Sequence, residues 1–177
     1  ILKKDQLVRA TTGRPGNTLM LVGSETGRDG IHGASGLASR TFEEERELRP
    51  TVQVSNPFME KVLIEACLAA AATGNVVGLQ DLGAAGLSTA SVETADKGGT
   101  GIEIDVSSVP RRDADMTSYE VMLSESQERM LVTVKANHLD EVKKVFDKWG
   151  LQSTVIGKST TSGMARVLDG EKPQGEI

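Results

Sequence analysis

Apolar residues recur along the chain with the two spacings that are typical of helices and of strands. After Pro57 they repeat every four residues, with Phe58 and Cys67 on one broad apolar face, which predicts a helix that begins at an Asn56 cap and ends at Gly74. Further helices are predicted at about 84–95, at 117–120 behind a capping box, and at 139–149 behind a cap at Asn137. Strands are predicted at 18–23, 76–81, 101–106, 129–134, 152–157 and 165–168.

The order of these elements favours an α+β fold with a mixed β-sheet and packed helices, because strands and helices do not alternate strictly. The helix at 139–149 lies between two strands and predicts one right-handed crossover unit. We expect a single domain over residues 1–177 and, since the chain opens at Ile1 without Met, a part of a longer chain. Cys67 is expected on a buried helix face, without a catalytic role.

Charge and composition argue against two classes of partner. A net charge of -5 leaves no basic excess to neutralise phosphates, and aromatic residues make up only 3%, so a nucleic-acid partner is not expected. No apolar run approaches the length of a membrane span, so no membrane partner is expected either. A single cysteine permits no internal disulfide and favours a reducing, cytoplasmic location.

The segment from Val76 to Leu87 is the most informative candidate site. A short apolar strand ends in Asp81, and glycines and small residues follow at once before a predicted helix. Such a turn places one carboxylate beside a hydrated metal ion and a phosphate, with the amides of the first helical turn facing the anion. An ordinary glycine turn with a solvated Asp81 explains the same residues equally well.

Two further segments combine glycine or serine with charged and amide side chains. The glycine-rich loop at 27–33 contains Arg28, Asp29 and His32, which suit an anion or a proton transfer; a surface pair between Arg28 and Asp29 with a solvated histidine is the alternative. The segment 124–129 has the donors and acceptors that grip a hydroxylated or phosphorylated ligand, or it is a plain polar loop. Gln53 lies in a short strand, where a solvent-facing position is usual.

Four motifs occur in this order along the chain: 27–34, 52–61, 80–87 and 122–130. Together they resemble phosphoribosylformylglycinamidine synthase, the synthetase component of purine biosynthesis, over residues 18–168. The resemblance implies the C-terminal domain of the first of two pseudo-repeated halves, of the aminoimidazole ribonucleotide synthetase type. It also implies an ATP-dependent amidation of formylglycinamide ribonucleotide, with ammonia supplied from glutamine by a partner glutaminase.

The resemblance assigns roles to individual residues. Asp81 matches a magnesium ligand. The residues that match substrate contacts are Gln53, Glu125, Ser126 and Gln127. The loop residues Arg28, Asp29 and His32 match a family motif and receive only the role of a possible active-site loop.

The resemblance also places important parts of the site elsewhere. The family's catalytic histidine, its ATP contacts and its other magnesium ligands belong to the remaining synthetase domains, so this chain alone is expected to bind Mg²⁺ and ATP poorly and to catalyse nothing. The alternative is a non-catalytic binding or assembly module of the same fold. Related kinases for selenophosphate or thiamine phosphate are expected to lack the string from Ser124 to Arg129.

Overall fold

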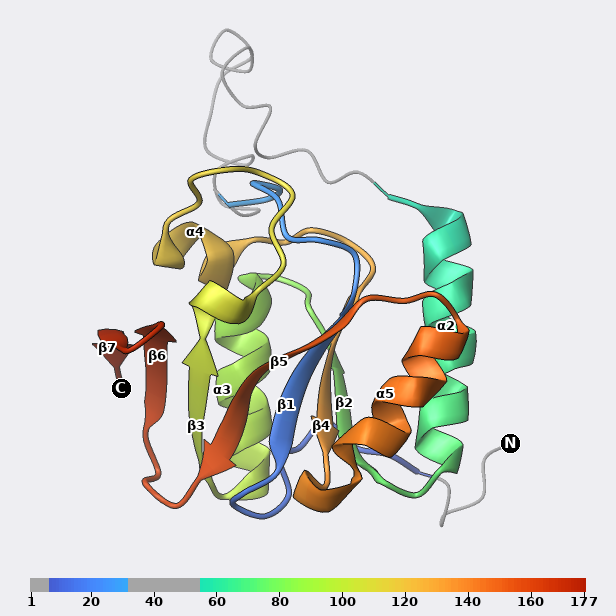
Figure 1. Ribbon diagram of the computed structural model, residues 1–177. Coiled ribbons are helices and arrows are strands. Elements are labelled where there is room, and N and C mark those ends of the chain that lie inside the picture. The colour runs from blue at the N-terminus through green and yellow to red at the C-terminus, as the bar shows by residue number, and fades with distance from the viewer. Residues whose placement is uncertain (1–6, 32–54) are drawn as a thin grey trace, which may run out of the picture.

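The computed structural model describes residues 7–31 and 55–177, and in this part of the chain seven strands form one mixed sheet with helices on both faces (Figure 1). The strands are β1 (Thr18–Gly23), β2 (Val76–Asp81), β3 (Gly101–Asp105), β4 (Arg129–Val134), β5 (Ser153–Thr160), β6 (Ala165–Asp169) and β7 (Lys172–Glu176). The helices are α2 (Pro57–Ala72), α3 (Gly86–Gly98), α4 (Ser118–Leu123) and α5 (Leu139–Lys148), with short 3-10 turns η4 (Val106–Ser108) and η5 (Ala136–His138). The predicted α+β class with a mixed sheet is confirmed.

The strand order is β2-β4-β1-β5-β3-β6-β7, and all neighbours are antiparallel except the parallel pair β3 and β6. β4 and β5 therefore run in the same direction on either side of β1, and α5 connects them. This arrangement confirms the predicted crossover unit, while its right-handed sense stays a prediction.

The core has two parts, one on each face of the sheet, and β1 contributes to both. Leu19 and Leu21 pack into the cluster that contains residues of α3 and α4, whereas Met20 and Val22 pack into the cluster that contains residues of α2 and α5. These four side chains are at most 3% exposed. Alternate side chains of a strand point to opposite faces, so a nearly continuous apolar run is what a central strand covered on both faces requires.

Helix α2 has the predicted start but a different apolar face. The Asn56 side chain accepts a hydrogen bond from the backbone N of Met59 at 3.1 Å, and Cys67 is buried as expected. The expectation for Phe58 is wrong, because its side chain is 77% exposed. A spacing of four residues advances about 40° beyond a full turn each time, so Phe58 lies about 140° around the helix from the buried Leu63.

Three other details correct the sequence analysis. Asn137 does not cap α5: it lies inside η5, and His138 occupies the cap position without a capping bond from its side chain to the helix backbone. Helix α3 begins at Gly86, because Ala85 before it has a left-handed φ of 59°. Strand β7 was not predicted, since it is polar and exposed throughout and carries no alternating pattern.

No helix in the described part of the chain is long and apolar enough to cross a bilayer.

Candidate functional site

The loops that carry the sequence motifs meet at one end of the sheet. Strands β1, β2 and β3 end there, and β4 begins there because it runs antiparallel to β1 and β2. The loop after β1 consequently lies against the loop before β4. Residues 99 positions apart come into contact, since the backbone N of Gly27 donates to the Ser126 hydroxyl at 2.9 Å.

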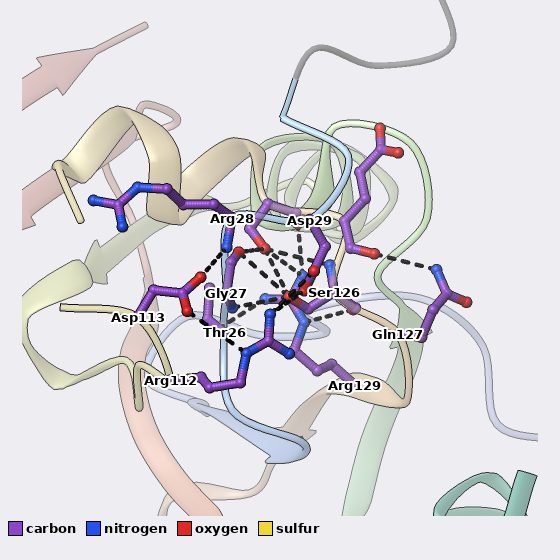
Figure 2. Close-up of polar contacts among 11 residues, drawn as sticks. Thr26, Gly27, Arg28, Asp29, Arg112, Asp113, Ser126, Gln127 and Arg129 are labelled. Atoms are coloured by element: carbon purple, nitrogen blue, oxygen red, sulfur yellow. Dashed lines mark hydrogen bonds and ion pairs between the residues drawn. The ribbon is translucent and has the colours of Figure 1, made fainter. Parts of the chain in front are cut away.

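Arg129, the first residue of β4, holds these loops together from inside. Its side chain is 2% exposed and donates to the backbone oxygen of Ser126 at 2.8 Å and of Ser124 at 2.6 Å. A third bond reaches the Thr26 hydroxyl at 2.9 Å. Figure 2 shows Arg129 beside Thr26 and Ser126, with dashed lines for the hydrogen bonds. Burial lowers the pKa of Arg129 to about 10 while the nearby Asp29 opposes that shift, so the group stays protonated at neutral pH.

Asp29 is the carboxylate of the glycine-rich loop that bonds both Arg112 and Ser126. Arg112 donates to both Asp29 carboxylate oxygens, at 2.9 and 3.0 Å, and the Ser126 hydroxyl makes a short hydrogen bond to the same carboxylate. The Asp29 backbone oxygen accepts from the Glu125 amide at 2.7 Å. The interlocked residues Thr26, Asp29, Arg112, Ser124, Ser126 and Arg129 are here called the clamp.

The two serines of the clamp are engaged inside the protein. The Ser124 hydroxyl donates to the Gly27 oxygen at 2.6 Å, and the Ser126 hydroxyl accepts the Gly27 amide. Both serines are at most 2% exposed. The interpretation of 124–129 as a plain polar loop is therefore wrong for Ser126, which is buried and bonded to another loop.

Glycines are required where the loops approach each other most closely. A Cβ atom on Gly27 would overlap the Arg112 guanidinium, and one on Gly30 would lie 2.6 to 2.7 Å from the Glu125 side chain. Gly30 also has a left-handed φ of 65°, which other residues rarely adopt. This glycine cluster therefore serves close packing between loops.

The start of α3 differs from the predicted anion cradle. The Ala85 amide donates to a carboxylate oxygen of Glu125 at 3.0 Å, and the Gly86 amide donates to the Gly83 oxygen at 3.0 Å. The prediction that the first-turn amides face a ligand is wrong for these two groups. Glu125 takes the place of the anion, which is favourable at the positive end of a helix.

Arg28 points away from the clamp and does not pair with Asp29, so the alternative of a surface pair between these two residues is wrong (Figure 2). Its guanidinium bonds Glu120 at 2.8 Å and the backbone oxygen of Asp115 at 2.9 Å. The bond from Arg28, together with the Thr117 backbone amide, lowers the pKa of Glu120 to about 2. The capping box between Thr117 and Glu120 is present as predicted.

Asp81 occupies a different setting from the clamp. Its side chain is exposed at the end of β2, and one carboxylate oxygen accepts from the Gln80 amide at 2.9 Å. A cavity of about 540 Å³ opens here, with apolar walls from α2 that include Leu63 and Leu68. The polar residues that line it beside Asp81 include Gln127 and Glu128, and we call Asp81, Gln127 and Glu128 the rim.

The donor set of the rim would suit one part of the coordination sphere of a magnesium ion. Across residues 7–31 and 55–177, no three His, Cys, Asp or Glu side chains are grouped so that they could enclose a metal. Asp81 offers one carboxylate, and proteins commonly hold Mg²⁺ by one or two carboxylates while water and phosphate oxygens complete the octahedron.

The structure describes six of the eight residues singled out from the sequence: five of them belong to or contact the clamp and the rim, whereas Arg28 points away. His32 and Gln53 lie outside the described residues. Sequence reasoning missed Arg129 and Arg112 as organising residues. Arg129 begins a predicted strand, and a charged residue at the start of a buried strand could have indicated a buried arginine. No sequence signal marks Arg112, because its partner Asp29 is 83 positions away.

A comparison with protein families matches residues 14–169 to the family described as AIR synthase related protein, C-terminal domain. The chain belongs to this family. The chain therefore has the fold of an AIR synthase related C-terminal domain, which is a mixed sheet with helices on both faces.

Curated relatives of this AIR synthase related domain carry the name phosphoribosylformylglycinamidine synthase subunit PurL. The chain is 56% identical to the protein of Thermomicrobium roseum over 169 residues, which cover 96% of the chain and 23% of that relative. It is 51% identical to the protein of Caldanaerobacter subterraneus over its whole length, which covers 24% of that relative. The chain thus spans about a quarter of the length of these relatives.

Solved structures agree with this assignment. Thermotoga maritima PurL complexed with FGAR superposes with a TM-score of 0.89 at 35% identity, covering 99% of the chain and 29% of that protein. The same protein complexed with ATP gives a TM-score of 0.84 at 33% identity, with 99% and 27% covered. Escherichia coli HypE, a hydrogenase maturation protein, shares the fold alone, with a TM-score of 0.64 at 21% identity over 91% of the chain and 48% of that protein.

Proposed function

We propose that this chain is the part of a phosphoribosylformylglycinamidine synthase that contributes ribonucleotide and magnesium contacts to a site completed by other domains. The observation that carries the proposal is the convergence at one sheet end of the rim and the clamp, from three separate sequence motifs. The Thermotoga maritima relatives complexed with FGAR and with ATP support a ligand pair of this kind.

The reaction is the ATP-dependent conversion of formylglycinamide ribonucleotide to formylglycinamidine ribonucleotide. The amide oxygen of the substrate takes the terminal phosphoryl group of ATP and releases ADP. Ammonia then adds to the activated carbon, and phosphate leaves with the former amide oxygen, so a C–N bond replaces a C–O bond. This chain contributes binding and orientation to both steps.

Asp81 is the residue of this chain that holds Mg²⁺, and the ion supplies charge neutralisation for phosphate oxygens. Gln127 bonds the sugar hydroxyls or the amide of the ribonucleotide, and its place in the lining of the same cavity as Asp81 supports this role. Glu125 and Ser126 act through the loop that they fix, since one Glu125 oxygen bonds Ala85 and the Ser126 hydroxyl bonds Gly27 and Asp29. Gln53 and His32 keep their predicted roles as a substrate contact and a loop residue.

The partners are the remaining synthetase domains and a glutaminase that supplies ammonia. The Thermotoga maritima structure named PurLQS supports an assembly with further subunits. A cytoplasmic location follows from the proposed place in purine biosynthesis. The chain on its own should be inactive, because the catalytic histidine, the ATP contacts and the other magnesium ligands belong to the remaining synthetase domains.

The test is ribonucleotide binding by the full-length protein that contains this chain. Calorimetric titration with formylglycinamide ribonucleotide in the presence of Mg²⁺ and a non-hydrolysable ATP analogue should show saturable binding, and addition of ATP and ammonium salt should yield ADP and phosphate in equal amounts. Saturable binding without turnover favours the alternative of a non-catalytic module. Absence of ribonucleotide binding contradicts the proposal.

A further inference from the structure

Arg129 is a buried charge whose side-chain hydrogen bonds, within the described part of the chain, all go to neutral acceptors. Its partners are two backbone oxygens and the Thr26 hydroxyl, with a weaker contact to the Ser124 hydroxyl at 3.5 Å. A buried guanidinium loses its hydration, and neutral acceptors restore only part of that loss. The nearby Asp29 carboxylate attracts the Arg129 charge, but the same carboxylate is bonded to Arg112, whose positive charge repels that of Arg129. Such an arrangement costs stability, which indicates a role other than stability.

The acceptors of Arg129 show what it controls. Nε donates to the backbone oxygen of Ser126 and Nη2 donates to that of Ser124, so the guanidinium holds the backbone on both sides of Glu125. Nη1 reaches across to Thr26, in the loop that follows β1. The planar guanidinium has donors in fixed directions, and a lysine ammonium cannot reproduce this geometry.

The backbone that Arg129 fixes leads directly into the rim. Gln127 follows Ser126, and its side-chain amide donates to the Glu125 backbone oxygen at 3.1 Å. The Glu125 amide in turn is fixed by the Asp29 oxygen at 2.7 Å. A shift of the backbone at 124–126 would therefore move Gln127 relative to Asp81 at the cavity.

We propose that Arg129 is a positioning residue that sets the place of Gln127 for ribonucleotide binding, through the backbone of Ser124 and Ser126. This proposal rests on the proposed function for the identity of the ligand. Arg129 also borders the cavity, but it is only 2% exposed and its guanidinium bonds the backbone oxygens of Ser126 and Ser124, so its role runs through that backbone.

Arg129→Lys in the full-length protein tests the proposal through the Michaelis constants. The constant for formylglycinamide ribonucleotide should rise about tenfold, the equivalent of one good hydrogen bond, while the constant for ATP changes less than about twofold. Thr26→Val removes only the third acceptor and should raise the ribonucleotide constant by a smaller factor, about threefold. This second variant keeps the test decisive if Arg129→Lys does not fold.

Arg111→Lys is the matched control, because Arg111 also donates to two backbone oxygens, those of Met116 at 3.0 Å and Val106 at 2.8 Å, outside the 124–126 backbone. It should leave both Michaelis constants unchanged even if the melting temperature falls. A ribonucleotide constant unchanged in both Arg129→Lys and Thr26→Val would overturn the proposal, because a purely structural role lowers the active fraction and not the affinity.

Hydrogen exchange separates this proposal from the proposed function. In the wild-type protein the Glu125 amide is bonded and should exchange slowly, and Arg129→Lys should accelerate exchange in peptides that cover 124–127, whereas Arg111→Lys should not. Unchanged exchange in Arg129→Lys overturns the positioning role whatever the ligand is. If the wild-type protein binds no ribonucleotide, the proposed function fails, and the exchange experiment still supports or overturns the control of the loop by Arg129.

Discussion

The clamp and the rim lie next to each other at the same end of the sheet, yet they are built in opposite ways. In the clamp, Asp29, Ser126 and Arg129 are at most 8% exposed, and their polar groups bond one another. In the rim, Asp81 is exposed beside a cavity of about 540 Å³, and its carboxylate accepts a hydrogen bond from the neighbouring Gln80. The comparison teaches that neighbouring residues of one sequence motif divide between the two groups, since Ser126 is buried and bonds other loops whereas Gln127 lines the cavity.

The rim is tested most strongly at Asp81. Asp81→Asn keeps the shape of the side chain but weakens it as a magnesium ligand, so the activity of the full-length protein should fall about a hundredfold. Raised magnesium concentration should restore part of it, which a magnesium titration of the initial rate would measure. Unchanged magnesium dependence in the variant would remove Asp81 from the metal site.

The clamp is tested at Ser126. Ser126→Ala removes the acceptor of the buried Gly27 amide and a partner of Asp29, so the free energy of unfolding should fall by about 1–3 kcal/mol. Urea denaturation of both proteins measures the difference. The apparent affinity for ATP should not change, and a variant as stable as the wild type would show that the clamp does not depend on this hydroxyl.

Gln127→Ala should give the opposite result to Ser126→Ala. The residue lines the cavity, so the apparent constant for formylglycinamide ribonucleotide should rise about tenfold, which corresponds to 1.4 kcal/mol. The free energy of unfolding should change by less than about 0.5 kcal/mol. If the constant for ATP rises and that for the ribonucleotide does not, Gln127 belongs to the nucleotide site.

The smallest effect is expected at the half-buried pair between Arg28 and Glu120, which lies outside both groups. The pKa of Glu120 is lowered from 4.5 to about 2, so its contribution to stability is fully present above about pH 4.5 and is lost as the pH falls toward 2. Glu120→Gln should remove that contribution, so the stability difference between wild type and variant should shrink over this range. Melting temperatures between pH 2 and 6 would show it, and a constant difference would contradict the assignment.

Much of the fold was predictable because local patterns determined it. The strand at 129–134, the Asn56 cap and the Thr117 capping box depend on neighbouring residues alone, and all three are confirmed. The prediction for Phe58 was wrong because positions four residues apart move gradually around a helix. Strand β7 was missed because a polar edge strand is specified by its pairing with β6. These failures concern surface positions, where burial gives no signal.

The candidate site was predictable as a set of residues but not as an arrangement. Motif order along the chain identified Asp81, Ser126 and Gln127 together. Motif order did not show that Ser126 is buried while Asp81 and Gln127 line a cavity. The partners that bury Ser126 lie about 100 positions away in the glycine-rich loop. Long-range partners of this kind become visible only when the sheet brings the loops together.

The division between clamp and rim is tested most directly by a crystal structure of the full-length protein with Mg²⁺ and formylglycinamide ribonucleotide bound. We predict a magnesium ion about 2.1 Å from an Asp81 carboxylate oxygen and a hydrogen bond from Gln127 to the ribonucleotide. The Ser126 hydroxyl should remain bonded to Gly27 and Asp29. A Ser126 hydroxyl turned out to the ligand, with Asp81 remote from the metal, would contradict the account.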